Sequence, residues 1–337
     1  MEGLHKSTRR DWVHRCAAMA AAAWQSAARA SQGLVLRFSH VVAPDTPKGM
    51  AAERFKVLLE QRTQGRIQVQ IFPNAQLYGD RDEMTALSLG AVEFVAPSLS
   101  KFGRLGLPQF ELFDLPFYYR SLADVRRISQ GPLGQRLFEG LSPYGLVGLG
   151  YFDNGFKQMS AHRPLRSPAD FVGLKMRIQA SGVIADQMRC LGAEPVVLPF
   201  HETRTALARG VVHGTENPLS NFWTQRMDKV QPHLSLSNHG YLGYAVVTNA
   251  RFWQRLSTTD RNLIQDALQE SLFFANQIAD AQNSHALQAL HTAGTTRIHS
   301  LQADELHAMR RAVAPVRDRL QSRIGAHWLD TLKAIYG

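Results

Sequence analysis

The segments GLKMRIQAS (residues 173–181) and LPFHETRTALARGVVHGTENPLSNFW (residues 198–223) guide the interpretation of the whole chain. Apolar and polar residues alternate around Arg177, which predicts a short strand with the guanidinium on its polar face. Glu216-Asn217-Pro218 predicts a turn in the second segment. A guanidinium binds a carboxylate through two parallel hydrogen bonds. By position alone, Arg177 is a candidate for binding an anion, and a surface salt bridge is the alternative.

The same region alternates between predicted strands and helices. The strand around Arg177 is followed by a helix from Ser181 to Leu191, a strand from Pro195 to Pro199 and a helix from Thr203 to Arg209. The N-terminal half has the same order, with elements expected at residues 34–39, 47–64, 67–71, 80–90 and 91–96. This order predicts a parallel sheet covered by helices. A chain of 337 residues is long enough for about two such domains.

Two polar residues follow the third predicted strand directly. Pro97-Ser98-Leu99-Ser100-Lys101 comes after the apolar run that ends at Ala96. In open α/β sheets, ligands bind outside the carboxyl ends of the strands. Ser98 and Lys101 therefore lie where a ligand is expected, although a lone lysine is more often solvated.

A long helix is predicted in the C-terminal part. A strand from Gly145 to Tyr151 is expected to lead into a second domain, and a strand from Gly243 to Thr248 is expected to return. Ser257 and Asp260 have the spacing of a capping box at a helix start. Neither proline nor glycine appears again until Gly294, so one long helix is expected between these positions.

Residues 1–30 have the features of an export signal. A basic front is followed by a short apolar run at residues 17–24, and Ala28-Arg29-Ala30 predicts a cleavage site before Ser31. The apolar run is too short to span a bilayer. The sequence from Thr8 to Val13 is typical of a twin-arginine signal, and the general secretory route remains an alternative. The mature protein is expected to be soluble and periplasmic.

The composition is that of a soluble globular protein with a basic excess. Apolar residues make up 45% of the chain, charged residues 20%, and the formal net charge is +10. Such an excess is compatible with nucleic acid, an acidic membrane surface or anionic ligands. The basic residues are scattered rather than clustered with aromatic residues. We therefore expect no nucleic-acid partner.

The usual catalytic and cofactor motifs are absent from the sequence. His201-Glu202-Thr203-Arg204-Thr205 does not have the H-E-x-x-H spacing of a zinc site, and no C-x-x-C occurs. There is no G-x-G-x-x-G, no Walker loop and no G-x-S-x-G nucleophile elbow. We therefore expect a binding protein with no cofactor and no metal, rather than an enzyme. An exported enzyme acting on an anionic small molecule remains a remote alternative.

A set of motifs extends over nearly the whole chain after the leader. They are FSHVVAPDTPKG, PNAQLYGDRDEM, APSLSKFG, LPQFELFDLPF, DNGFKQMSA, GLKMRIQAS, LGAEPV, GVVHGTENPLSNFWTQ and NHGYLGY. Together they resemble the solute-binding proteins of tripartite ATP-independent periplasmic (TRAP) transporters, the DctP family, and in particular its C4-dicarboxylate group. The resemblance implies two α/β domains of the periplasmic-binding-protein type, a ligand cleft between them and a long helix spanning both.

The resemblance also implies domain limits and partners. The first domain is expected to comprise residues 31–153 and about 243–282, and the second residues 154–242 and about 283–337. The ligand is expected to be a small carboxylate, captured by closure of the two domains. The loaded protein is expected to dock on the small and large TRAP permease subunits, with uptake driven by an ion gradient.

Seven residues are expected to contribute to the ligand site. The resemblance implies that Arg177 pairs with the ligand carboxylate and that Asn217 approaches the same group. Lys157 matches a second basic position of related binders, and Phe200 matches an aromatic residue that lines the cleft. Three further candidates lie in first-domain loops that face the cleft: His40, Ser98 and Lys101.

The sequence departs from the family pattern at two places. His213 replaces the acidic residue that commonly follows G-V-V, and residues 201–204 read His-Glu-Thr-Arg where small-Glu-aliphatic-Tyr is usual. The first change could alter ligand choice or pH response, although a surface role beside the hinge is the simpler expectation. Because of the second change, the family pattern does not determine the shape of the pocket around Phe200.

A C4-dicarboxylate such as malate, succinate or fumarate is the favoured ligand. A binding protein of the same type for a monocarboxylate, keto acid, aromatic acid or sugar acid is the alternative. A buried diacid requires a second cation or several donors, because an unpaired buried carboxylate is costly. Lys101 and Lys157 are the candidates for that second cation.

Overall fold

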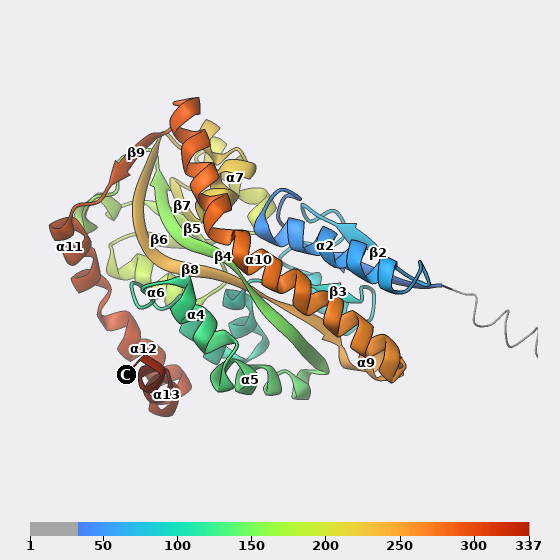
Figure 1. The fold of residues 1–337 in the computed structure, drawn as a ribbon. Coiled ribbons are helices and arrows are strands. Elements are labelled where there is room, and N and C mark those ends of the chain that lie inside the picture. The colour runs from blue at the N-terminus through green and yellow to red at the C-terminus, as the bar shows by residue number, and fades with distance from the viewer. Residues whose placement is uncertain (1–32, 337) are drawn as a thin grey trace, which may run out of the picture.

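Residues 33–336 are described by the computed structural model and are built around one mixed sheet (Figure 1). The strand order is β2-β1-β3-β8-β4-β7-β5-β6, and β9 pairs with β8. The strands are β1 (Leu34–Ser39), β2 (Ile67–Phe72), β3 (Phe94–Val95), β4 (Leu146–Ala161), β5 (Lys175–Ile178), β6 (Glu194–Val197), β7 (Gly214–Asn217), β8 (His233–Asn249) and β9 (Arg297–Ser300).

Each half of the sheet has the predicted parallel pairing. In the first half β1 pairs in parallel with β2 and β3. In the second half β5 pairs in parallel with β6 and β7. The two halves are joined by β4 and β8, which are antiparallel to each other and run between them (Figure 1). The prediction of two α/β units with crossing strands is therefore confirmed.

The two crossing strands are longer than the sequence predicted. β4 has 16 residues and does not end at Tyr151, and β8 has 17 and begins at His233 rather than Gly243. The predicted strand ended at Tyr151, but several of the polar residues that follow are buried with partners; Asp153, for example, accepts a hydrogen bond of 2.6 Å from Tyr241. Three register shifts between β4 and β8 let the pair bend while pairing continues.

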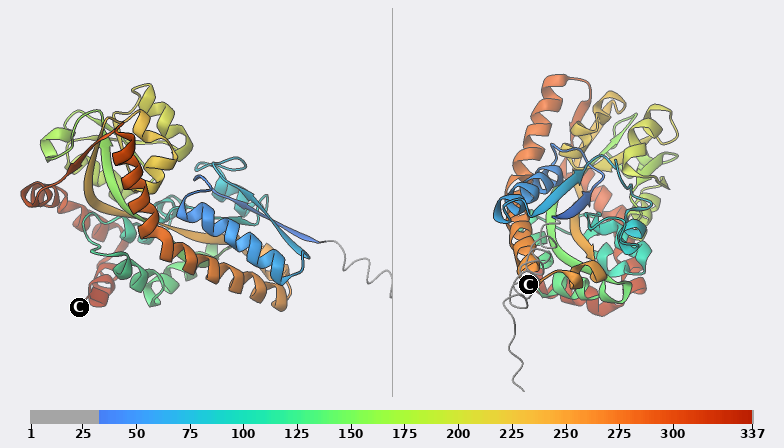
Figure 2. Two further views of the ribbon diagram at one scale, coloured as in Figure 1. Left: turned by 45° about the horizontal axis from the view of Figure 1, so that its top comes forward. Right: turned by 90° about the vertical axis from the view of Figure 1, so that its right-hand side faces the viewer.

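Helices cover both faces of the sheet (Figure 2). The α-helices are α2 (Pro47–Arg62), α3 (Glu83–Ser88), α4 (Leu122–Ser129), α5 (Pro132–Glu139), α6 (Gly182–Cys190), α7 (Phe200–Ala208), α8 (Leu219–Thr224), α9 (Ala250–Arg255), α10 (Thr258–Ala293), α11 (Ala303–Val313), α12 (Pro315–Ile324) and α13 (Ala326–Tyr336). Short 3₁₀ helices are η1 (Leu99–Leu105), η2 (Pro108–Asp114), η3 (Ser142–Tyr144), η4 (Pro168–Phe171) and η5 (Met227–Lys229).

The predicted long helix is α10, which has 36 residues and contacts both halves of the molecule. It packs against α2 in the first half and α8 in the second. Ser257 is its N-cap and accepts a hydrogen bond of 3.0 Å from the backbone of Asp260, as the spacing predicted. Gly294 ends it in the left-handed region with φ of 61°. Across residues 33–336, no helix has both the length and the apolar character that crossing a membrane requires.

Two hydrophobic cores lie on opposite faces of the sheet. Side chains alternate along a strand, so Val246 of β8 belongs to the core under α2 and α10, while Val247 belongs to the core under α4, α5 and α6. The second core also includes Leu329 of α13, which packs against α4. The expected domain limits, including the assignment of residues 283–337 to the second domain, stay a prediction.

Gly155 offers a test of how β4 bends between the two halves. Its φ is +140°, and a Cβ there would lie 2.5 Å from Nδ2 of Asn283 on α10. Gly155→Ala should lower the free energy of unfolding by about 1–3 kcal/mol, measured by urea denaturation. Gly240→Ala on β8 is the matched control, because its Cβ would meet only Lys157 at an ordinary 3.6 Å. Equal losses in the two variants would contradict this account.

Candidate functional site

A narrow cavity lies between the two halves of the molecule. Its polar lining comes from Asp80, Ser98, Lys101, Gln179, Asn217 and Asn221. It measures about 10 Å³, room for about one water molecule. It adjoins an outer hollow of about 290 Å³ that shares Asp80, Lys101 and Gln179 and adds Arg177. A larger hollow of about 420 Å³ between α5 and α10 has no charged side chain in its lining, so it offers no ion pair to a carboxylate.

Arg177 is a buried cation whose guanidinium fork has free donors. It lies in the centre of β5, between β6 and β7, and is 2% exposed. Its Nε donates to the carbonyl of Leu198 at 2.9 Å, and its guanidinium carbon lies 5.7 Å from the centre of the Phe200 ring. Within the described residues, Nη1 and Nη2 have no hydrogen-bond partner. A carboxylate is the group that such a fork binds best.

The charge of Arg177 is not matched by a carboxylate in contact with it. Burial lowers the pKa of Arg177, and the carboxylates of Asp80 and Glu216 act against that shift from beyond ion-pair distance. An arginine nevertheless stays protonated in a protein. The site therefore holds a buried positive charge that a ligand carboxylate would neutralise.

Asn217 and Phe200 also lie in the cavity wall, on the same half as Arg177. Asn217 ends β7, is 4% exposed and donates from Nδ2 to Oγ1 of Thr215 at 3.2 Å. Phe200 begins α7 and is 7% exposed. The structure therefore brings three of the predicted residues together at the carboxyl ends of parallel strands.

The facing wall contains Lys101, which is paired with two acids of its own half. Its ammonium group forms ion pairs with Asp80 and Glu83. Burial alone would raise the pKa of Asp80, but Lys101 and Arg177 outweigh burial and hold that pKa at about 2. Burial raises the pKa of Glu83, with Lys101 acting against the shift. Burial would lower the pKa of Lys101, but the two acids raise it.

Two hydrogen bonds join the walls across the cavity. Ser98, a predicted site residue, accepts from Nε2 of Gln179 at 2.9 Å. Asp80 accepts from the backbone N–H of Phe200 at 2.5 Å, so an acid of the first half caps the start of α7 in the second. These contacts hold the two halves closed around the cavity.

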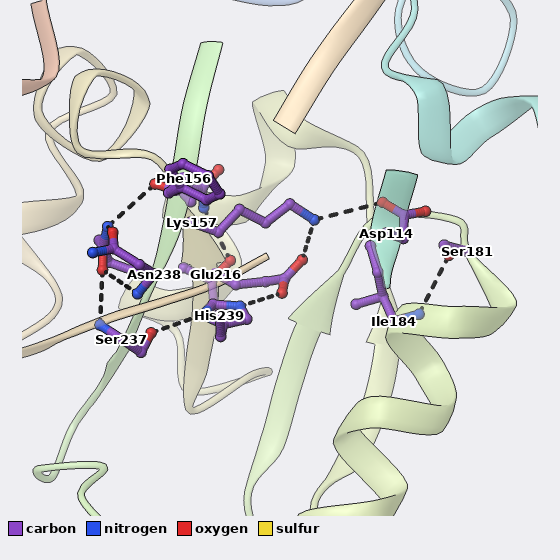
Figure 3. A network of polar contacts seen from close by, with 12 residues as sticks. Asp114, Phe156, Lys157, Ser181, Ile184, Glu216, Ser237, Asn238 and His239 are labelled. Atoms are coloured by element: carbon purple, nitrogen blue, oxygen red, sulfur yellow. Dashed lines mark hydrogen bonds and ion pairs between the residues drawn. The ribbon is translucent and has the colours of Figure 1, made fainter. Parts of the chain in front are cut away.

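Lys157 and His40 are not in the cavity lining. Lys157 forms an ion pair of 2.8 Å with Glu216, and its ammonium lies 3.9 Å from Asp114 (Figure 3). His239 contacts the other oxygen of Glu216 at 2.8 Å. His40 is fully buried beside the cavity, where burial and the charge of Lys48 lower its pKa to about 3. The structure thus gives Lys157 a partner inside the protein and leaves His40 uncharged.

The protein shifts the pKa values of two acids near Lys157, Glu216 and Asp114. Burial alone would raise the pKa of Glu216, but Lys157 and His239 lower it to about 2. Burial raises the pKa of Asp114 to about 7, although Lys157 acts in the opposite direction. Lys157 and Glu216 therefore form a charged pair directly behind Asn217, on the strands β4 and β7 that position it.

Several lining residues were not identified from the sequence. Asp80 was interpreted only as part of a helix start, and Gln179, Asn221 and Tyr244 were not singled out. One signal could have identified Gln179: it lies two positions after Arg177, and residues two apart share a strand face. Asp80 and Tyr244 come from segments far from Arg177 in sequence, so only the folded chain brings them to the site.

The two departures from the family pattern lie outside the inner cavity. His213 is half-buried and accepts a hydrogen bond of 3.0 Å from the backbone of Lys175. Glu202 forms an exposed ion pair of 3.1 Å with Arg81 of the other half. Residues 201–204 therefore contribute a contact between the two halves. Their influence on ligand choice stays a prediction.

Comparison with known proteins identifies the family. Residues 38–323 match the sequence model of the bacterial extracellular solute-binding proteins, family 7, DctP. The chain belongs to this family. The C4-dicarboxylate-binding periplasmic protein DctP of Rhodobacter capsulatus is 49% identical over 304 residues, 90% of this chain and 91% of that relative.

Solved structures of TRAP periplasmic solute binding proteins have the same fold. One from Shewanella oneidensis with bound succinate is 41% identical, with a TM-score of 0.88 and coverage of 90% of this chain and 100% of that one. One from Pseudomonas aeruginosa with bound L-malate is 39% identical, with a TM-score of 0.82 and coverage of 85% and 99%.

These findings confirm the predicted family and the two-domain binding fold. Because the family consists of solute-binding proteins, they also confirm that the chain is a binding protein rather than an enzyme. The predicted export signal at residues 1–30 lies outside the described residues.

Removing Lys157 should test whether its charge supports the fold. Lys157→Met leaves Glu216 buried beside a neutral His239 and should cost about 3–5 kcal/mol of unfolding free energy, measured by urea denaturation. Lys157→Met/Glu216→Gln removes both charges and should be more stable than the single variant. The stability that comes from the lowered pKa of Glu216 should be fully present above about pH 4.3, the pKa of an exposed glutamate. It should be lost as the pH falls toward 2. A single variant as stable as wild type would rule out this role.

Proposed function

We propose that this protein is the solute-binding subunit of a TRAP transporter and captures a C4-dicarboxylate such as succinate, malate or fumarate. The observation that carries the proposal is the buried guanidinium of Arg177, whose Nη1 and Nη2 have no partner within residues 33–336 and which shares a hollow with Lys101. Further support comes from the ligands named for the relatives, which are C4-dicarboxylates, succinate and L-malate.

In this proposal the two carboxylates of the ligand are bound by different halves. Arg177 binds one carboxylate through its free fork, and the amide of Asn217 donates to the same group. Lys101 and Ser98 receive the second carboxylate at the facing wall. A buried carboxylate needs a cation or several donors, and the two walls supply one cation each.

Closure of the two halves buries the ligand. The inner cavity is too small for a four-carbon acid, so a ligand can reach Asn217 only if the walls separate. Separation breaks the contacts of Asp80 with Phe200 and of Ser98 with Gln179. The crossing strands β4 and β8 connect the halves and are the segments about which such a motion would turn.

We further propose that the protein acts in the periplasm and delivers its ligand to the TRAP permease subunits. The export signal predicted at residues 1–30 and the periplasmic location in the names of relatives support this location. The family membership supports the permease as partner. Export by the twin-arginine route, with the general secretory route as the alternative, is part of the same proposal. So are the domain limits given above.

Arg177→Met tests the assignment of the carboxylate site. The variant removes a charge-assisted bidentate pair and should weaken succinate binding by about 2–5 kcal/mol, at least 30-fold in Kd, measured by isothermal titration calorimetry. Arg177→Lys should also bind weakly, because an ammonium does not reproduce the planar fork. Arg209→Met at an exposed position is the control and should bind as wild type does.

The ligand panel should contain C4-dicarboxylates, monocarboxylates, and keto, aromatic and sugar acids. Near-native succinate affinity in Arg177→Met would overturn the site. If the wild-type protein binds a monocarboxylate or a sugar acid but no C4-dicarboxylate, the assignment to a TRAP transporter stands and the proposed ligand is wrong.

A further inference from the structure

Lys48 is a buried lysine one layer behind the cavity wall. It is the second residue of α2 and is 0% exposed. Its ammonium donates to the carbonyl of Ala96 at 2.9 Å and lies 3.6 Å from the centre of the Tyr244 ring. Tyr244 lines the cavity, so its aromatic ring separates this cation from the space that a ligand would occupy. Among residues 33–336, no carboxylate lies within ion-pair distance of Lys48.

The groups around Lys48 leave its charge poorly compensated. The titratable groups that act on it or contact it are Lys101, Glu83, Asp80, His40 and Tyr244. Burial lowers the pKa of Lys48 to about 7; Lys101 adds to that shift, while Glu83 and Asp80 oppose it. Burial lowers the pKa of His40 to about 3 and raises the pKa of Tyr244 well above its usual value, so both side chains are uncharged at neutral pH.

The remaining charges beside the cavity cancel. Lys101 and Arg177 are positive, and Asp80 and Glu83 are negative when ionised. Lys157 and Glu216 form a further pair with no net charge. A dicarboxylate would add two negative charges to this balanced set. Since a buried charge without compensation is costly, the bound ligand favours a proton on Lys48, which has no carboxylate partner within residues 33–336.

We propose that Lys48 is a further specificity-determining residue of this site, which takes up a proton from solvent when a dicarboxylate binds and thereby favours dianions over monoanions. The inference rests on the proposed dicarboxylate function. Lys48 would not touch the ligand. Its charge would act through the Tyr244 ring, whose electron-rich face already holds the ammonium.

The sign of the pH dependence follows from this uptake. The dianion raises the pKa of Lys48 above the value of about 7 in the unliganded protein. Below that pH the amine is protonated with and without ligand, so Kd is constant. Above it, binding must recruit a proton from the buffer, and Kd rises by up to about tenfold per pH unit. A monocarboxylate, with half the charge, should show a weaker dependence.

Calorimetry of the wild-type protein measures the uptake directly. Succinate is titrated at pH 8 in phosphate and in Tris, whose ionisation enthalpies differ, and the slope of the observed enthalpy gives the number of protons bound. The expected result is an uptake between about one half and one proton per succinate, together with a Kd that increases from pH 7 to pH 9. This experiment needs no variant, so it does not depend on how substitutions fold.

Variants then locate the proton. Lys48→Met should abolish the uptake, flatten the pH profile of Kd and reduce the preference for succinate over butyrate by at least about tenfold. Lys56→Met, on the same helix at a half-buried position, is the matched control and should keep the wild-type uptake. Glu83→Gln and Asp114→Asn test two other groups that could take a proton, because burial raises the pKa of both acids.

The outcomes separate this inference from the proposed function. If wild type binds succinate with no proton uptake and a Kd independent of pH, the role of Lys48 is wrong while the dicarboxylate function stands. If Glu83→Gln or Asp114→Asn abolishes the uptake and Lys48→Met retains it, Lys48 is not the acceptor, and the inference is again overturned. If wild type binds no C4-dicarboxylate at all, the proposed function fails first.

Discussion

The burial of Arg177 without a contacting carboxylate is the constraint on which the site depends. Moving an unpaired cation out of water costs several kcal/mol even after the protein relaxes. The fold offsets part of that cost with the Leu198 carbonyl, the Phe200 ring and the more distant charges of Asp80 and Glu216. In the proposed function, the strongest possible partner, a carboxylate in direct contact, comes from the ligand. Ligand binding and domain closure would then be one event, because only a closed site makes that contact in a dry environment.

The surrounding acids are kept away from Arg177 by partners of their own. Glu216 is occupied by Lys157 and His239 (Figure 3). Asp80 is occupied by Lys101 and by the start of α7. Each pairing keeps a protein carboxylate out of the position that we propose for the ligand carboxylate. The same pairings hold strands β4 and β7 and helix α7 in place around the cavity. The contacts that set the charges of the site therefore also position its backbone.

Much of this arrangement could be predicted from the sequence, because it depends on local patterns of residues. The alternation around Arg177 predicted β5, and the Ser257–Asp260 spacing with no later glycine before Gly294 predicted α10. The position after the third predicted strand indicated Ser98 and Lys101, and family motifs added Asn217 and Phe200; all four lie in the cavity wall. These residues follow strands directly, where position in the sequence nearly determines position in space.

What could not be predicted depends on contacts between distant segments. The full length of β4 was missed, because the buried partners of its polar residues on β8 lie about ninety positions later in the chain. The resemblance alone made Lys157 a predicted ligand residue, and nothing local shows that Glu216 pairs with Lys157 and also contacts His239. Lys48 was not singled out from the sequence, because only the fold brings the Tyr244 ring against its ammonium. Pairing across the sheet, rather than local pattern, decides these cases.

The most direct test of the account is a crystal structure of the mature protein grown with succinate. The account predicts one carboxylate bound by both Nη atoms of Arg177 and by the amide of Asn217, with the other carboxylate at Lys101. A succinate bound without contact to Arg177 would contradict the central claim that this buried cation holds the ligand.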